Sequence, residues 1–214
     1  MKIIQMKKFL LTAAAILFAI VSVNAQFTNA AKKSNSAAGA GFTYRGEVNI
    51  GMSIGGSKYD GNKVKGTMIG PYVTGTYGIK FNDYLFAGVG AGLKYMHQGK
   101  DEDGAKLTIN NFMLPLFLEV KGFYPISDEI APFLVLDLGY SIHLGGKYKM
   151  EYNGWTSSEQ NTKGGFMFKI GAGLAYKQFT FGIGYDRQNM GIKDWDKNLN
   201  CNSFYFTVGY VFKE

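Results

Sequence analysis

From about residue 43 onward, apolar residues occupy every second position in one segment after another. In FMFKIGAGLAY, residues 166–176, large apolar residues take one set of alternate positions, and Lys169 and glycines take much of the other. Successive side chains of a β-strand point to opposite faces, so this period of two predicts strands. Such strands are expected at 43–54, 69–81, 84–97, 108–123, 131–143, 165–177, 178–188 and 202–212. Most exceed the roughly 5–6 residues usual in soluble sheets and suit a tilted bilayer crossing of about 9–11 residues.

The connections between these segments alternate in length. Three are short, around Asn82-Asp83, Pro125–Glu129 and Lys177-Gln178, and the others are long and hydrophilic, at 55–66, 98–106, 145–163 and 189–201. Short turns at one end and long loops at the other are typical of outer-membrane barrels, whose turns face the periplasm. An even number of strands brings both ends of the chain to the turn end. We therefore expect periplasmic termini and long, mobile extracellular loops.

The two faces of the predicted strands differ in chemistry. One face carries large apolar residues such as Leu116, Leu136 and Phe206, and we expect no charge on it. The other face is rich in glycine and collects Arg45, Glu47, Lys80, Lys94, Glu119, Lys121, Asp137, Lys169 and Asp186. Charged residues and glycines make a poor packed core, so we predict that the apolar face contacts lipid. A soluble lipocalin-like barrel, the alternative, would invert the two faces.

The nine charged residues predict a closed lumen. An eight-stranded barrel is only wide enough for its own side chains to fill. Unpaired buried charges are costly, and five cations against four anions nearly balance. We expect these residues to form an internal ion-pair network that plugs the barrel, with the glycines making room for the long charged side chains.

The N-terminal 25 residues have the features of a secretory signal peptide. Lys2, Lys7 and Lys8 precede the apolar run Phe9–Val23, and small residues end at Ala25. We divide the chain into this signal peptide (1–25), a flexible periplasmic lead-in (26–42) and a barrel domain (43–214). The only cysteine, Cys201, excludes an intrachain disulfide and is expected to be a lone loop thiol.

Composition narrows the classes of partner. The formal charge falls from +7 to +4 when the leader removes three lysines and no acid, and the aromatics are not grouped with a basic patch. A nucleic-acid partner is therefore not expected. After the leader no apolar run approaches the roughly 18 residues of a transmembrane helix.

Residues 110–124, NNFMLPLFLEVKGFY, have a proline near the start of an apolar strand, followed by Leu-Phe-Leu-Glu-Val-Lys. This stretch resembles the P-L-L-L-K strand of PorT-like outer-membrane β-barrel proteins, and the layout from the Ala-Gln cleavage end to the last strand FYFTVGYVF is similar to theirs. The resemblance implies an all-β fold, an eight-stranded antiparallel up-and-down transmembrane barrel in a Gram-negative outer membrane.

The last strand looks like the terminal signal read by the barrel-assembly machinery. Gly209, Tyr210 and Phe212 match that signal, although Lys213-Glu214 follow the aromatic residue that normally ends the chain. The resemblance therefore implies the assembly machinery as a partner.

Candidate catalytic and metal-binding residues are few. His97 and His143 lie near the outer ends of their strands, without a recognisable Ser/His/Asp set, and we expect them at the rim. Asp101-Glu102-Asp103 could hold a hard cation, but the spacing matches no EF-hand loop and favours a solvated loop tip. We predict no catalytic residue, metal or cofactor.

Trp155 and Trp195, both in long loops, are the best candidates for contact with an extracellular ligand, or else pack at headgroup level. The expected role is structural or surface-binding: adhesion, recognition or envelope integrity, with outer-membrane lipid as a partner. Two alternatives stay open, a narrow channel or transporter for small or apolar molecules, and an outer-membrane hydrolase or acyltransferase.

Overall fold

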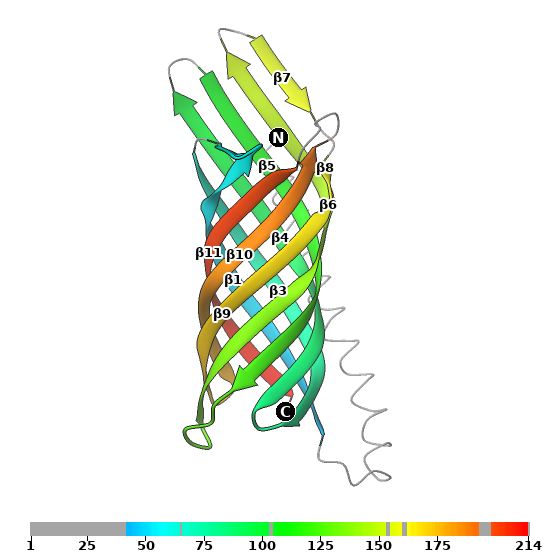
Figure 1. Cartoon of the computed structure of the whole chain (residues 1–214), viewed down its shortest axis with the longest axis vertical. Coiled ribbons are helices and arrows are strands. Elements are labelled where there is room, and N and C mark those ends of the chain that lie inside the picture. Colours follow the sequence, from blue (N-terminus) through cyan, green and yellow to red (C-terminus); the bar gives the residue numbers. More distant parts are fainter. Residues whose placement is uncertain are drawn as a thin grey trace.

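The computed structural model describes residues 42–64, 66–102, 105–152, 155–159, 162–192 and 198–213, which form one antiparallel sheet closed on itself (Figure 1). The wall consists of β1 (Thr43–Tyr59), β3 (Thr67–Asn82), β4 (Leu85–Glu102), β5 (Ala105–Phe123), β6 (Ile130–Tyr152), β9 (Gly165–Tyr176), β10 (Phe179–Ile192) and β11 (Leu199–Lys213). Each wall strand pairs with its neighbour in chain order, and β11 pairs with β1 from Lys213 to Leu199. The predicted eight-stranded antiparallel barrel is confirmed. Among the residues described, no helix is long and apolar enough to cross a membrane.

Much of what was expected to be long loop is strand. β4 and β5 stay paired out to Glu102 and Ala105, and β6 continues to Tyr152, where it pairs with β7 (Trp155–Glu159). In Figure 1 these hairpins rise well above the rest of the wall. Pairing uses the main chain, so a strand can extend into water on both faces, where no apolar alternation marks it. The loop boundaries predicted from hydrophilicity were therefore wrong at this end.

A tight turn within the first expected loop explains one of these extensions. β1 turns back into β2 (Asn62–Lys63) through Asp60 and Gly61, whose φ angles are 49° and 79°. Two left-handed residues in a two-residue connection are the requirement of a type I′ hairpin, and Asp-Gly is a preferred sequence for it. On the other side of the wall, β8 (Thr162–Lys163) pairs with β10.

The short turns lie at the opposite end of the barrel, together with the start of β1 and the end of β11 (Figure 1). At the β3–β4 turn, Asn82 Oδ1 accepts hydrogen bonds from the backbone N–H groups of Tyr84 and Leu85 at 2.8 and 2.9 Å. At the β9–β10 turn, Lys177 adopts a φ of 51°. We call this the turn end and the other the hairpin end.

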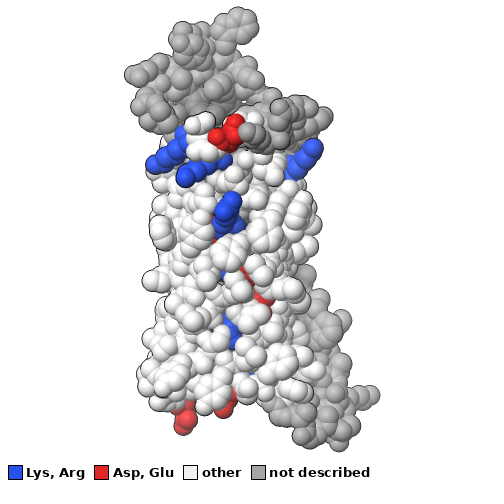
Figure 2. All heavy atoms as spheres, viewed as in Figure 1, with Lys and Arg blue, Asp and Glu red and all other residues white. Residues whose placement is uncertain are grey.

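The outer wall is an apolar band. Large apolar side chains stand outward on every wall strand, and the most exposed include Leu134 (69%), Ile183 (68%) and Phe204 (76%). Along β6 the band reaches from Leu134 to Leu144, which at about 3.3 Å per residue and a tilt of about 40° spans about 25 Å along the axis. That height suits the hydrocarbon core of an outer membrane. Figure 2 shows most of the wall as uncharged surface, with a few charged atoms visible at mid-height.

Aromatic pairs border this band at both levels. Toward the turn end, ring centroids lie 5.7 Å apart in Phe42–Phe81, 6.1 Å in Tyr44–Tyr77 and 5.5 Å in Phe179–Tyr210. Toward the hairpin end, the corresponding pairs are Tyr95–Phe112 at 4.7 Å and Tyr185–Phe204 at 6.3 Å. Two such girdles at the membrane–water interfaces are characteristic of transmembrane barrels.

Two residues depart from the expected outer face. Arg187 continues the alternate positions Phe181, Ile183 and Tyr185, which point outward on β10, and it is exposed. The expectation of an uncharged outer face was therefore wrong at this position. Arg187 lies one outward position beyond the Tyr185 girdle, where a charge can leave the hydrocarbon. Leu93 lies at an outward position of β4 but is only 4% exposed.

Candidate functional site: the filled lumen

A first layer of charges fills the lumen near the turn end. β1 turns Arg45 and Glu47 inward, and β5 turns Glu119 and Lys121 inward, with each residue at most 4% exposed. Glu47 is the centre of the layer: Arg45 Nη2 donates to its Oε2 at 3.2 Å, while Lys121 Nζ and Thr180 Oγ1 both donate to its Oε1 at 2.9 Å. The aromatic rings of Phe123 and Phe133 lie 5.0 Å from the Arg45 guanidinium and 5.5 Å from the Lys121 amine.

Glu119 is held less firmly than Glu47. Its Oε1 lies 3.1 Å from Lys121 Nζ, yet outside hydrogen-bonding geometry, so this contact is purely electrostatic. In the β5–β6 ladder Glu119 also stands directly opposite Asp137, a second carboxylate facing the lumen. Like charges in directly opposed positions repel each other.

A second layer lies nearer the middle of the barrel. Lys169 on β9 approaches Asp137 on β6 at 3.3 Å, and its amine lies 4.5 Å from the Tyr205 ring and 5.5 Å from the Tyr72 ring. Lys94 on β4 pairs across the lumen with Asp186 on β10. These two pairs line a cavity of about 30 Å³, room for about two water molecules.

Eight of the nine residues predicted for the network form these two layers. They are four cations and four anions: Arg45, Glu47, Lys94, Glu119, Lys121, Asp137, Lys169 and Asp186. Lys80 is placed elsewhere. Its amine lies 3.5 Å from Asp83 at the β3–β4 turn, and its side chain is 18% exposed.

Aromatic rings fill the lumen between the charges, and the alternation of apolar and polar residues did not predict them. Phe117, Phe133 and Tyr72 each lie over a glycine of a neighbouring strand, Gly90, Gly173 and Gly51 respectively, and Tyr205 on β11 reaches across β10 to Gly171 on β9. A Cβ at any of these glycines would overlap the ring. The glycines therefore make room mainly for rings, and for a charged side chain chiefly at Gly209, where a Cβ would lie 2.9 Å from Glu47 Oε1.

The signal for these rings was hidden in runs that are apolar on both faces. In MLPLFLEV, residues 113–120, Phe117 stands between outward Leu116 and Leu118, and strict alternation does not reveal an inward apolar side chain inside such a run.

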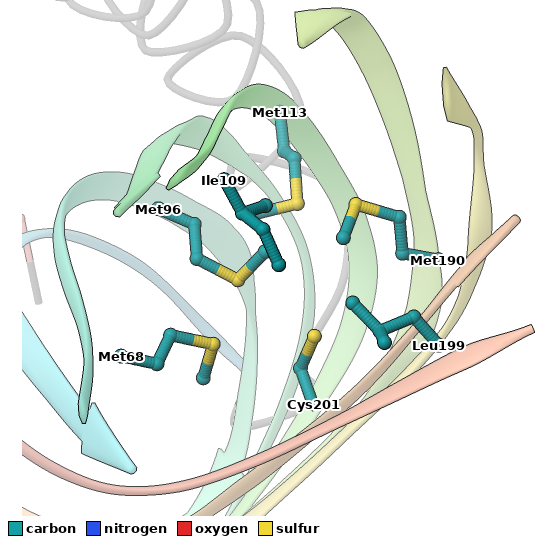
Figure 3. Close-up of a cluster of buried hydrophobic side chains, with 7 residues drawn as sticks. All are labelled: Met68, Met96, Ile109, Met113, Met190, Leu199 and Cys201. Carbon is teal, nitrogen blue, oxygen red and sulfur yellow. The ribbon is translucent and has the colours of Figure 1, made fainter. Parts of the chain in front are cut away.

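An apolar cluster closes the lumen toward the hairpin end. Its side chains, all at most 2% exposed, converge from several strands in Figure 3: Met68, Met96, Ile109, Met113, Met190, Leu199 and Cys201. The expectation that Cys201 is a loop thiol was wrong, because β11 begins at Leu199 and turns Cys201 inward. Methionine side chains adapt to irregular space, which suits the packing of this cluster.

Polar contacts anchor the first hairpin to this cluster. Ser57 Oγ on β1 donates to Gln98 Oε1 on β4 at 2.7 Å, across the intervening β3. Gln98 Nε2 donates to the carbonyl oxygens of Val64 at 3.2 Å and Gly66 at 3.0 Å. The contacts fold the β1–β3 connection over the barrel mouth.

The two histidines face opposite sides of the wall. His97 stands outward and exposed, with its Nδ1 2.7 Å from Asn110 Oδ1, which also accepts from the Tyr95 hydroxyl at 2.7 Å. His143 faces inward, with its Nδ1 2.6 Å from the amide nitrogen of buried Asn111. Both histidines thus contact amides.

The remaining predicted residues are mostly outside what the structure describes. Asp101 and Glu102 continue β4, and Trp155 begins β7, but their side chains, like Asp103 and Trp195 as a whole, lie outside the described residues. So do the predicted signal peptide, residues 1–25, and the lead-in up to residue 41. Within the described part of the chain, no group of three or more His, Cys, Asp or Glu could hold a metal ion.

The predicted assembly signal lies on the last strand. Tyr210 stands outward in the turn-end girdle, and its hydroxyl donates to Gln178 Oε1 at 3.1 Å. Gly209 faces the lumen beside Thr180 and Asn49, and the ring of Phe212 covers Gly46.

Several solved outer-membrane proteins are similar to this chain in fold. Ail of Yersinia pestis, in complex with the heparin analogue sucrose octasulfate, is 18% identical with a TM-score of 0.49, over 79% of this chain and 99% of that one. OprG of Pseudomonas aeruginosa is 16% identical with a TM-score of 0.42, over 81% and 96%. The outer membrane enzyme PagL is 14% identical with a TM-score of 0.41, over 74% and 97%. No curated protein sequence matches the chain.

The family model for the outer membrane protein beta-barrel domain matches residues 13–212. That range contains all the wall strands up to the last residues of β11. The closed antiparallel wall, its apolar outer band and its two aromatic girdles are the structural features that such a family requires. The chain belongs to the outer membrane β-barrel protein family.

Proposed function

We propose that the protein is a non-conducting outer-membrane barrel with a structural or surface-binding role, which presents its hairpin end to the exterior and keeps both termini in the periplasm. The observation that carries this is the pair of contacts that cross the lumen. Lys121 on β5 reaches Glu47 on β1 near the turn end, and Lys94 on β4 reaches Asp186 on β10 in the middle. These strands lie three and four positions apart around the eight-stranded wall, so both contacts obstruct the axis. Near the hairpin end the buried apolar cluster closes the lumen, and Gln98 contacts Ser57 across β3.

The chemistry of the lumen also supports a plug. The ion pairs are balanced in sign within each layer, which leaves no surplus charge to attract one kind of ion.

Conductance in planar bilayers tests the plug. The folded protein is expected to show no stable steps under conditions in which a porin control conducts. Steady, ion-selective openings that change in Lys121→Gln would refute the plug and favour a channel.

The surface-binding role is supported by the paired strands that carry β4–β5 and β6–β7 beyond the apolar band. Replacing residues 100–107 by an Asn-Gly turn should leave folding intact and reduce attachment of expressing cells to host-cell or matrix-coated surfaces. If the variant is folded and exposed at the cell surface but attachment is unchanged, a purely structural role is favoured.

A narrow channel is the second candidate, because a cavity of about 30 Å³ lies in the second layer, beside the Lys94–Asp186 and Lys169–Asp137 pairs. Passage would require the Lys94–Asp186 pair to separate. Lys94→Gln should therefore raise conductance if this candidate is correct, and leave it unchanged if the lumen is a plug.

A further inference from the structure

Five sulfur atoms gather in the lumen at the hairpin end. Of the nine methionines in the chain, Met1 and Met6 lie in the expected leader, and four of the remaining seven lie in the apolar cluster there, together with the only cysteine. Each comes from a different strand, β3, β4, β5, β10 and β11, and Figure 3 shows the side chains converging on one shared space. We call these residues the sulfur cluster: Met68, Met96, Met113, Met190 and Cys201.

Packing alone does not account for this concentration of sulfur. Leucine, isoleucine and phenylalanine fill a core with better-defined side-chain conformations than methionine. Lower in the lumen the barrel uses aromatic rings such as Phe117 and Phe133 to fill space. Among the described residues, the one other methionine that faces the lumen is Met167. Sulfur is thus placed at one height of the barrel, which favours a role for the sulfur atoms themselves.

A histidine and an amide border the cluster with unused bonding capacity. His143 is directly opposite Met113 in the β5–β6 ladder. The amide nitrogen of Asn111, which is 0% exposed, lies 2.6 Å from His143 Nδ1 and 2.6 Å from Met190 Sδ. The buried Nε2 of His143 and Oδ1 of Asn111 have no hydrogen-bond partner in the described part of the chain. A nitrogen donor therefore lies beside the thioethers.

Reversing the Asn111 amide would prepare this histidine for a metal ion. Its Oδ1 would then accept from His143 Nδ1–H, which leaves the lone pair on Nε2 available and ends the donation to Met190 Sδ. A metal-binding histidine ordinarily donates its other N–H to an oxygen in this way.

The donor set selects the kind of ion. Thioether and thiolate sulfur are soft ligands and suit Cu(I), whereas hard cations such as Ca²⁺ and Mg²⁺ take oxygen. Charge narrows the choice further, because Cys201 supplies at most one negative charge in the cluster. One thiolate balances a monovalent ion, but a divalent ion would leave a net charge buried, which is costly.

We propose that the sulfur cluster binds one soft monovalent metal ion, Cu(I) or its analogue Ag⁺, through the Cys201 thiolate and the methionine thioethers, with His143 as a neighbouring nitrogen donor. When the metal–sulfur bond forms, the Cys201 thiol releases its proton to solvent and the oxidation state of the metal does not change. Tyr59 and Val64 of the first hairpin pack against the cluster, and every cluster residue is at most 2% exposed, so the bound ion is shielded from water.

Silver binding to the folded, detergent-solubilised full chain tests the proposal. Ag⁺ is the probe because it shares the charge and softness of Cu(I) and needs no reductant. Equilibrium dialysis in chloride-free buffer gives the dissociation constants of the unmodified protein, Met96→Leu/Met113→Leu, Cys201→Ser and Met167→Leu. Exchanging methionine for leucine conserves volume, and a gel assay of heat-modifiable migration verifies that each variant is folded. Met167→Leu is the matched control, since it removes a buried lumen methionine outside the cluster.

The unmodified protein and the control should bind one Ag⁺ per chain, and Zn²⁺ should not displace it. The double variant should bind at least about tenfold more weakly, because even the loss of an indirect partner of a metal ligand has an effect of that size. No binding by the unmodified protein, or displacement by Zn²⁺, would overturn the proposal. Affinity that is unchanged in the double variant and lost only in Cys201→Ser would also overturn it, since the ion would then sit on an isolated thiol.

X-ray absorption of the Cu(I)-loaded unmodified protein gives a second test that needs no variant. The first coordination shell should consist mainly of sulfur, and a shell of oxygen and nitrogen alone would contradict the site. None of these outcomes depends on conductance or on cell attachment, so they are distinguishable from failure of the proposed function.

Discussion

The two glutamates of the turn-end layer offer a closely matched comparison. Glu47→Gln and Glu119→Gln are both isosteric, and both leave the layer with the same net charge, because each removes one anion from two cations and two anions. They differ in contacts alone. Glu47 accepts from Arg45, Lys121 and Thr180, whereas Glu119 has a single electrostatic contact with Lys121.

The magnitudes follow from those contacts. Hydrogen bonds to charged groups contribute about 1.5–3 kcal/mol each, and breaking a buried ion pair costs about 3–5 kcal/mol. Glu47→Gln weakens two such bonds and leaves Arg45 poorly compensated, so we expect the free energy of unfolding to fall by about 3–5 kcal/mol. Glu119→Gln leaves Lys121 bonded to Glu47 at 2.9 Å and removes the repulsion from Asp137, so we expect a change within about 1 kcal/mol.

Guanidinium titration of the barrel folded into phospholipid vesicles, followed by far-ultraviolet circular dichroism, measures both free energies. Glu129→Gln is the surface control: it breaks an exposed pair with Lys177 and should cost less than about 1 kcal/mol. Equal losses for the two lumen variants, or a larger loss for Glu119→Gln, would show that net charge and not the contacts of Glu47 governs the layer.

Three further predictions concern the wall, the glycines and the orientation. Leu118→Arg, at a side chain 63% exposed in the middle of the band, should lower the free energy of unfolding in vesicles by about 2–4 kcal/mol. Tyr124→Arg, beyond the turn-end girdle, should lower it by at most about 1 kcal/mol, and similar costs for the two variants would contradict the apolar band. Gly90→Ala should destabilise by about 1–3 kcal/mol because its Cβ meets the Phe117 ring, whereas Gly122→Ala, with nothing within 4 Å, should be nearly neutral in the same titration. An impermeant maleimide added to intact cells should label Lys63→Cys at the hairpin end and not Asp128→Cys at the turn end. Cys201 should give little background labelling, because it is only 2% exposed. The reverse labelling would show that the turn end faces the exterior.

The local pattern of residues was enough to predict the strands and most of their faces. The direction of a side chain on a strand depends only on its parity, so Phe181, Ile183 and Lys169 could be assigned to a face without knowing any neighbour. The turn-end connections were also predictable, because a short link between two strands forces an antiparallel hairpin.

The hairpin-end boundaries were not predictable from hydrophobic alternation. Beyond the membrane both faces of a strand meet water, so β4, β5 and β6 continue through polar sequence that lacks the two-residue period. The dipeptides Asp60-Gly61, Asp103-Gly104 and Asn153-Gly154 were the local signals for hairpins there. The same reasoning explains Arg187, whose parity is that of the outer face but whose position along β10 lies beyond the girdle.

What the sequence by itself determined was therefore the set of strands, their apolar outer face and the presence of balanced charge inside. The tertiary structure alone decided which charges meet: Glu47 with Lys121 rather than Lys169, and Lys94 with Asp186 rather than Glu119. The physical reason is that contacts across a lumen depend on the stagger of all eight strands at once, and a slip of one residue in any ladder would turn that strand's inward side chains out. Parity places a charge inside the barrel, but its height, and so its partner, is set by the closed wall.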